Sequence, residues 1–285
     1  MGSKAKKIFA VSMLCAFVLV VAAVALLSSL SDKKSDFDIS ECPATLNGTP
    51  DYGQNYVNNI VFLGDRTILD MMTQLSSDNE SLSPQVWSGK DGTLSLNYNT
   101  DKATIVLPEN QSEMLLTAAL AEKKPRYLVI TIGLENGVPY CDKDTFCDYY
   151  QKLIDAVQKS SPSTKIILQS IFPVTSKYER KHPAISNEKI SECNQWICAL
   201  AEQNKLRFLN TAECLADSNG NLQKDLASKD GGSLNADGYA AVIEYIRAHG
   251  YKDHPNFELP TEQITEIPTE VSTEVATEAP TEMAS

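Results

Sequence analysis

The chain has 285 residues, of which 42% are hydrophobic and 22% are charged. This composition is typical of a globular protein with one or two domains and excludes a mini-protein held together by disulfides alone. The formal net charge of −12 argues against a nucleic-acid partner, because such partners are gathered by a cationic surface.

The N-terminal end has the pattern of a membrane anchor. Residues 1–7 hold three lysines and residues 8–30 hold no charged residue. At ~1.5 Å per residue, this apolar run can cross a ~30 Å hydrocarbon core as a helix. The preceding lysines favour a cytoplasmic N-terminus, so we expect a single-pass protein of the cell membrane whose domain lies outside the cytoplasm.

The alternative for this end is a cleaved signal peptide and a secreted protein. The apolar run is longer than the usual ~7–15 residues of a signal peptide, and a clean A-x-A cleavage site is missing, so the anchor is favoured. A lipoprotein is disfavoured, because Cys15 lies within the run and follows Leu14. Residues 31–50 are interpreted as a juxtamembrane linker.

Residues 51–253 alternate between short apolar runs and helical patterns. The expected strands are 59–63, 127–132, 165–169 and 206–209, with a further strand near 85–87. The expected helices are 67–75, 111–123, 144–160, 186–204 and 235–249. This alternation predicts an α/β fold, a three-layer α/β/α arrangement with a flavodoxin-like, doubly wound parallel sheet.

The C-terminal segment, 254–285, reads as a disordered acidic tail. From Pro260 onward a Thr-Glu pair recurs every four residues, without lysine or arginine and with prolines along its length. Proline and like-charge repulsion oppose a helix, so we expect an extended, solvated spacer.

Six cysteines lie outside the apolar run. Cys141 and Cys147 bracket a short polar loop and are the easiest local pair, whereas Cys193 and Cys198 point to different faces of one predicted helix. Each of the latter is expected to reach another element, with Cys214 as one candidate partner. No C-x-x-C pair exists and the three histidines do not cluster with the cysteines, so neither a metal site nor a cofactor is predicted.

Ligands of doubly wound folds gather beyond the carboxyl ends of the strands. Four segments follow predicted strands there: 64–67, 133–136, 170–173 and 210–211. A glycine after a strand is also a common turn device, so none of these segments alone identifies a site.

Taken together, four blocks resemble the SGNH (GDSL) hydrolase family. The sequence IVFLGD at 60–65 resembles its first block, LVITIGL at 128–134 its third, and ILQSIFPV at 167–174 the following strand and loop. The most specific block is DGGSLNADGY at 230–239. The resemblance implies the SGNH fold and an ester hydrolase ancestry.

The resemblance fails at the positions that carry the chemistry. The nucleophilic serine of the family is replaced by Arg66, the oxyanion asparagine by Glu135 and the general-base histidine by Ser233. Asn136 stands one residue late for the oxyanion role. Asp230 of the last block remains, as does a candidate second-block glycine, Gly92 or, less well placed, Gly89.

These losses predict a degenerate member of the family. A guanidinium offers only donors, an imidazole is missing, and a carboxylate would repel the oxyanion. We therefore expect a pseudohydrolase that binds a glycan or an acylated cell-surface ligand. We also expect an ion pair of Arg66 with Glu135 or Asp230, and Ser233 in the same cleft.

Two alternatives stay open. The chain is an active esterase or acyltransferase if Thr67 serves as nucleophile, Asn136 reaches the oxyanion and His182 swings in as the base. It is an extracellular interaction scaffold if the domain holds no small ligand.

Overall fold

The computed structural model describes residues 39–75 and 85–251. The expected basic segment at 1–7, the anchor at 8–30 and the tail at 254–285 lie outside the described residues. No helix within the described ranges has both the length and the apolar character needed to cross a membrane.

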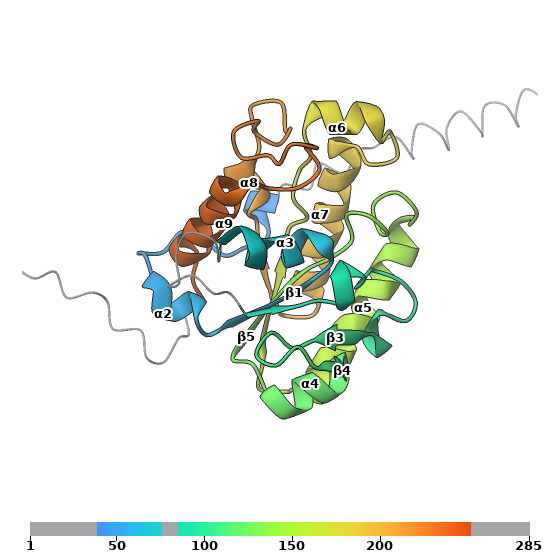
Figure 1. Ribbon diagram of the computed structural model, residues 1–285, viewed down its shortest axis with the longest axis vertical. Coiled ribbons are helices and arrows are strands. Elements are labelled where there is room, and N and C mark those ends of the chain that lie inside the picture. Colours follow the sequence, from blue (N-terminus) through green and yellow to red (C-terminus); the bar gives the residue numbers. More distant parts are fainter. Residues whose placement is uncertain (1–38, 76–84, 252–285) are drawn as a thin grey trace, which may run out of the picture. The chain divides into compact units, whose positions relative to one another are not determined.

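A parallel sheet of five strands forms the centre of the described domain, in the order β2-β1-β5-β6-β7 (Figure 1). Its strands are β1 (Ile60–Gly64), β2 (Gln85–Trp87), β5 (Tyr127–Thr131), β6 (Lys165–Gln169) and β7 (Arg207–Leu209). Most residues of these segments are apolar and buried, as a sheet covered on both sides requires. The five predicted strands and their parallel pairing are confirmed.

Helices cover both faces of the sheet and complete three layers, so the predicted fold class is confirmed. Their bounds are α2 (Gly53–Val57), α3 (Arg66–Leu75), α4 (Leu116–Lys123), α5 (Lys143–Ser160), α6 (Ser176–Lys181), α7 (Asn187–Gln203), α8 (Ala212–Leu215) and α9 (Ala236–Ala248). The apolar residues of α4, α5 and α7 pack on one face against alternate strand residues such as Leu63 and Ile130. Those of α2, α3 and α9 pack on the other face against Phe62 and Val129.

The segment between β2 and β5 differs from the prediction. Two 3-10 turns, η2 (Lys90–Gly92) and η3 (Thr100–Lys102), lead to an antiparallel ribbon of β3 (Thr104–Val106) and β4 (Glu113–Leu115). The helix expected at 111–123 therefore begins only at Leu116. Gln111 has a φ of +57°, a turn conformation that excludes a helix start there. Residues Glu113–Leu115 then form β4 of the ribbon.

The domain begins before the predicted boundary at residue 51. After a 3-10 turn, η1 (Ile39–Glu41), the segment 42–46 runs beside β7: the Phe208 amide donates to Ala44 O (2.9 Å) and the Leu46 amide donates to Phe208 O (2.8 Å). Cys42, Ala44 and Leu46 are buried. Part of the predicted linker 31–50 is thus an added edge of the sheet.

The cysteines of the described part are free thiols. The expected bridge between Cys141 and Cys147 is not formed, and the Cys141 thiol donates instead to Asn136 O (3.9 Å). Cys214 does not serve as the expected partner of the α7 cysteines, because its thiol donates to the carbonyls of Thr211 and Ala241.

A different pair of thiols lies in contact. The Cys42 thiol donates to Cys198 O (3.7 Å), and both side chains are buried. A hydrogen bond with Cys42 adds to burial in raising the pKa of the Cys198 thiol. The pair joins the added edge segment to α7.

We predict that Cys42 and Cys198 form a disulfide when the protein refolds with oxidised glutathione, which is reduced as the bond forms. The closed loop is long, so the bond should stabilise the fold by about 3–4 kcal/mol. Peptide mapping without reductant checks the pairing, and Cys42→Ser should remove the gain in Tm while Cys214→Ser leaves it. Alkylation of Cys42 after oxidative refolding would contradict the prediction.

Candidate functional site

The first and third blocks meet at the carboxyl ends of neighbouring strands. β1 pairs with β5 in a register that sets Gly64 opposite Thr131. A Cβ on Gly64 would lie 2.2 Å from the Thr131 carbonyl oxygen, so no larger residue fits there. The turn that follows β1 therefore lies against the turn that follows β5, as the family resemblance predicts.

Asp65 joins these two turns. Its carboxylate accepts hydrogen bonds from the Thr67 amide (3.1 Å), the Thr67 hydroxyl (2.6 Å) and the Gly133 amide (3.0 Å). Burial raises the pKa of Asp65, while hydrogen bonds from Thr67, Gly133 and Leu134 oppose that rise. Asp65 thus links the turn after β1 to the turn after β5, and it accepts the hydrogen bond that the Thr67 hydroxyl donates.

Arg66, which follows the Gly-Asp turn after β1, does not form the expected ion pair. Its Nε donates to Asp70 Oδ1 (2.9 Å), and its side chain is 56% exposed. The prediction of an ion pair with Glu135 or Asp230 is wrong. Asp70 lies one helical turn along α3, and a partner four residues away needs less ordering of the long side chain than a partner on another loop.

Of the two candidate second-block glycines, Gly92 is the one that contacts Arg66. Its φ is +77°, and a Cβ there would lie 2.9 Å from the Cα of Arg66. The Gly92 amide donates to Gly89 O (2.9 Å), so this amide is occupied within its own turn. A Cβ on Gly89 would meet Leu94 of the same loop instead, which leaves Gly92 as the residue that contacts the first block.

We expect Gly92→Ala to lower the free energy of unfolding by about 2–3 kcal/mol, because a strained φ costs ~1–3 kcal/mol and the added methyl meets Arg66. Gly220→Ala is the matched control, since Gly220 has a φ of +78° and its Cβ would meet nothing within 4 Å. Urea denaturation of both variants checks this. Equal losses of unfolding free energy in the two variants would show that the contact with Arg66 does not contribute to the effect.

Glu135 and Asn136 follow β5 after Gly133, whose φ is +124°. Both side chains are exposed. Partial burial and the nearby charge of Asp65 raise the pKa of Glu135, and the charge of Arg66 opposes this rise. Glu135 therefore places a carboxylate near the first block.

Asp230 of the last block accepts hydrogen bonds from residues next to it in the same loop. The Ser233 hydroxyl donates to Ser228 Oγ (2.9 Å), and the Ser228 hydroxyl and the Gly232 amide both donate to Asp230 Oδ1. Burial would raise the pKa of Asp230, but the hydrogen bonds from Ser228 and the backbone hold it below its ordinary value. Ser233 is thus linked to Asp230 through the Ser228 hydroxyl, and its expected place in one cleft with Arg66 stays a prediction.

Tyr178 of α6 belongs to the site and was missed from the sequence. A Cβ on Gly232 would lie 2.3 Å from its ring. Burial, together with the charges of Glu135 and Asp230, raises the pKa of Tyr178. His182 stacks on the Tyr178 ring with 4.2 Å between the ring centroids. The Tyr178 ring therefore lies between the imidazole of His182 and the last-block turn at Gly232. The sequence signal for α6 was Thr175, a residue type that favours the N-cap position and caps this short helix.

The last helix is tied to the first block. Tyr239, within the DGY motif, is fully buried, and its hydroxyl donates to the carbonyl of Thr67. The scaffold around Arg66 is therefore held from three sides, by Asp65, Gly92 and Tyr239.

The model of the GDSL-like lipase/acylhydrolase family matches residues 73–241, more than half of the chain. No curated protein matches the chain.

Several solved structures are similar. A GDSL-like lipase from Bacteroides thetaiotaomicron is 17% identical over 66% of this chain and 85% of its own, with a TM-score of 0.46. The periplasmic domain of a lipopolysaccharide acetyltransferase from Salmonella ser. Paratyphi A is 16% identical over 73% and 91%, with a TM-score of 0.46. A carbohydrate esterase family 3 protein from Talaromyces cellulolyticus is 14% identical over 66% and 93%, with a TM-score of 0.43.

Proposed function

Because the chain belongs to the GDSL-like lipase/acylhydrolase family, we propose that it is a catalytically inactive member that binds a glycan or an acylated ligand at the cell surface. The charge-free run at 8–30 would anchor it in the membrane with the domain outside the cytoplasm. One observation carries the proposal: the reactive positions are replaced by Arg66, Glu135 and Ser233, while the surrounding scaffold is kept.

The replaced residues lack the chemistry of ester hydrolysis. Arg66 is protonated and cannot attack a carbonyl carbon. Asp230 has a lowered pKa and no imidazole to orient. Tyr178 has a raised pKa, so its phenol stays protonated at neutral pH and is a poor nucleophile. The site therefore offers hydrogen-bond donors without a nucleophile and base pair.

Binding is supported by the accessibility of the same surface. The Arg66 side chain is 56% exposed and donates to Asp70 through Nε, which leaves the outer edge of the guanidinium facing solvent. The Tyr178 hydroxyl and the exposed Glu135 lie nearby. Such donors and acceptors suit the carbonyl of an acyl group and the hydroxyls of a sugar.

The second candidate is an active acylhydrolase, which membership in an acylhydrolase family favours. It requires Thr67 as the nucleophile and His182 as the base. The Thr67 hydroxyl is buried and donates to Asp65, and His182 stacks on Tyr178. The geometry thus gives less support to this candidate than to the binding protein.

The test is an assay of the full chain, purified in detergent, with p-nitrophenyl acetate and with a fluorophosphonate probe that labels activated serine and threonine. The proposal predicts hydrolysis at the buffer rate and no labelling. Phosphonate-sensitive hydrolysis that Thr67→Val abolishes, with the fold intact, would establish the active enzyme instead.

A further inference from the structure

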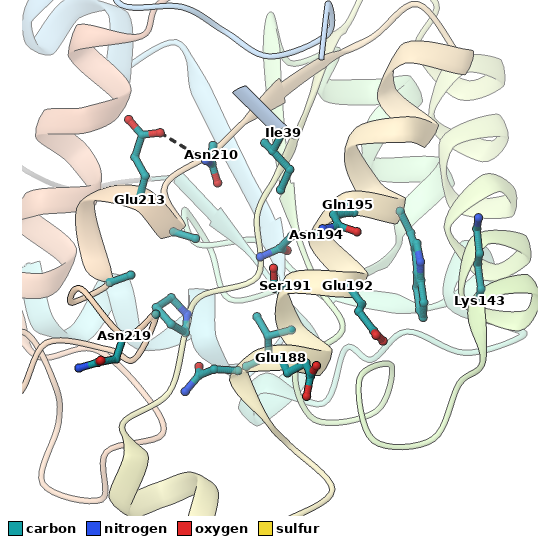
Figure 2. Close-up of a pocket in the computed structure, with 17 residues that line it drawn as sticks. Ile39, Lys143, Glu188, Ser191, Glu192, Asn194, Gln195, Asn210, Glu213 and Asn219 are labelled. Atoms are coloured by element: carbon teal, nitrogen blue, oxygen red, sulfur yellow. Dashed lines mark hydrogen bonds between the residues drawn. The ribbon is translucent and has the colours of Figure 1, made fainter. Parts of the chain in front are cut away.

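A cavity of about 920 Å³ lies between α7 and the segment that follows β7 (Figure 2). It is separate from the family positions, since its lining contains neither Arg66, Glu135 nor Ser233. Its volume lies within the ~300–1,000 Å³ typical of small-molecule sites. The polar lining residues are Lys143, Asn187, Glu188, Ser191, Glu192, Asn194, Gln195, Asn210, Glu213 and Asn219.

The wall between this cavity and the family site is preformed. Asn194 accepts from the Ile171 amide (2.7 Å) and donates to Ile171 O (3.0 Å), and Asn187 holds Val174 in the same way (2.9 and 2.8 Å). Two amides of α7 thereby clamp both ends of the loop after β6. On the other side of this loop, the Thr175 amide donates to Gly231 O (2.9 Å).

Polar groups face the cavity from two sides. Figure 2 shows Gln195 and Glu192 of α7 on one side, Asn210 and Glu213 on the other, and Asn194 between them. The Asn210 amide donates to Glu213 Oε2 (3.3 Å). Within the described ranges, the side-chain amide of Gln195 has no hydrogen-bond partner. Both amide atoms of Asn194 are engaged by Ile171, so Gln195, Asn210 and the carboxylates are the groups left for a ligand.

The chemistry of the lining selects the class of ligand. A side-chain amide both donates and accepts, as a sugar hydroxyl does, and a carboxylate accepts from two hydroxyls. The lining holds five amides, three carboxylates and one ammonium group, so its net charge is negative and repels anionic sugars. A polycation would pair with the carboxylates but would offer no acceptor to the side-chain N–H groups of Gln195 and Asn219.

We propose that this cavity binds a neutral glycan, with Gln195 and Asn210 as hydrogen-bonding residues on opposite walls. The inference is independent of the proposed function, because the cavity uses none of the degenerate family positions. It holds equally if the domain is found to hydrolyse esters.

The test uses the full chain in a non-glycosidic detergent, applied to an array of neutral, anionic and cationic glycans. The best neutral glycan and oligolysine are then titrated calorimetrically. We expect a neutral glycan to bind with a Kd near ~10⁻⁴ M, and the double variant Gln195→Ala/Asn210→Ala to weaken it at least about tenfold. Gln203→Ala, an exposed amide at the end of α7 outside the cavity, is the matched control and should leave the Kd unchanged.

Thermal unfolding of each variant separates loss of binding from loss of fold. The proposal is overturned if no neutral glycan binds, if the folded double variant binds as well as the unmodified chain, or if oligolysine binds and neutral glycans do not. Weakening by Arg66→Ala but not by the double variant would place the glycan at the family site and would also overturn the proposal.

Discussion

Replacing Asp65 with alanine is expected to lower the free energy of unfolding by about 3–5 kcal/mol. The carboxylate accepts hydrogen bonds from Thr67 and Gly133 at 2.6–3.1 Å, and Asp65 is 4% exposed. Truncation would leave buried N–H groups of two turns without acceptors. Because those turns hold Arg66 and Glu135, the candidate site should loosen together with the fold.

Asp70→Ala is the control for this prediction. Asp70 is a nearby carboxylate on α3, and its ion pair with Arg66 is largely exposed, so its loss should cost only ~0–1 kcal/mol. Urea denaturation of both variants, monitored by circular dichroism, provides the comparison. Similar losses of unfolding free energy in the two variants would mean that the hydrogen bonds of Asp65 do not hold the first and third blocks together.

The sheet and its order around Asp65 were predictable from the sequence because the signals there are local. Runs such as 60–64 and 127–131 are apolar enough to be buried on both faces, and the Gly-Asp turn follows directly. The family blocks then indicated which turns meet. Gly92 was named from the sequence as a candidate second-block glycine, but its contact with Arg66 appears only in the structure.

The partner of Arg66 was mispredicted although its signal was present. Asp70 stands four residues after Arg66 on a predicted helix, and this spacing alone favours an ion pair. Reasoning from the family placed Glu135 and Asp230 near Arg66 and overlooked the local competitor. The site is consequently open, with an exposed cation, rather than closed by a buried ion pair.

Tyr178 and the α7 cavity could not be read from the sequence because they depend on long-range placement. α6 is only six residues long, too short for a periodic signal. Two residues of its lining, Asn187 and Asn194, turn inward to bind the loop after β6. Nothing in the pattern of an amphipathic helix separates an asparagine that clamps a loop from one that faces solvent.

The triple variant Arg66→Ser/Glu135→Asn/Ser233→His is expected to hydrolyse p-nitrophenyl acetate at least about 100-fold faster than the unmodified chain. A positioned base contributes ~10²–10⁴-fold to such a rate, and an oxyanion donor contributes ~10²–10³-fold. The lowered pKa of Asp230 keeps it ionised to orient the new imidazole. Arg66→Ser alone should give no gain, since it lacks both base and donor. The Gly92 amide is bonded to Gly89, so the asparagine must supply the oxyanion contact.

The initial rate of nitrophenolate release measures the gain, and adding Asp230→Ala to the triple variant should remove most of it. Circular dichroism confirms that each variant is folded. A folded triple variant without activity would show that the site has diverged beyond three residues, for example through the Tyr178 ring that packs on Gly232. If the triple variant is active and the unmodified chain is as fast, the inactive assignment is refuted, because the three replaced residues are then no obstacle to the reaction.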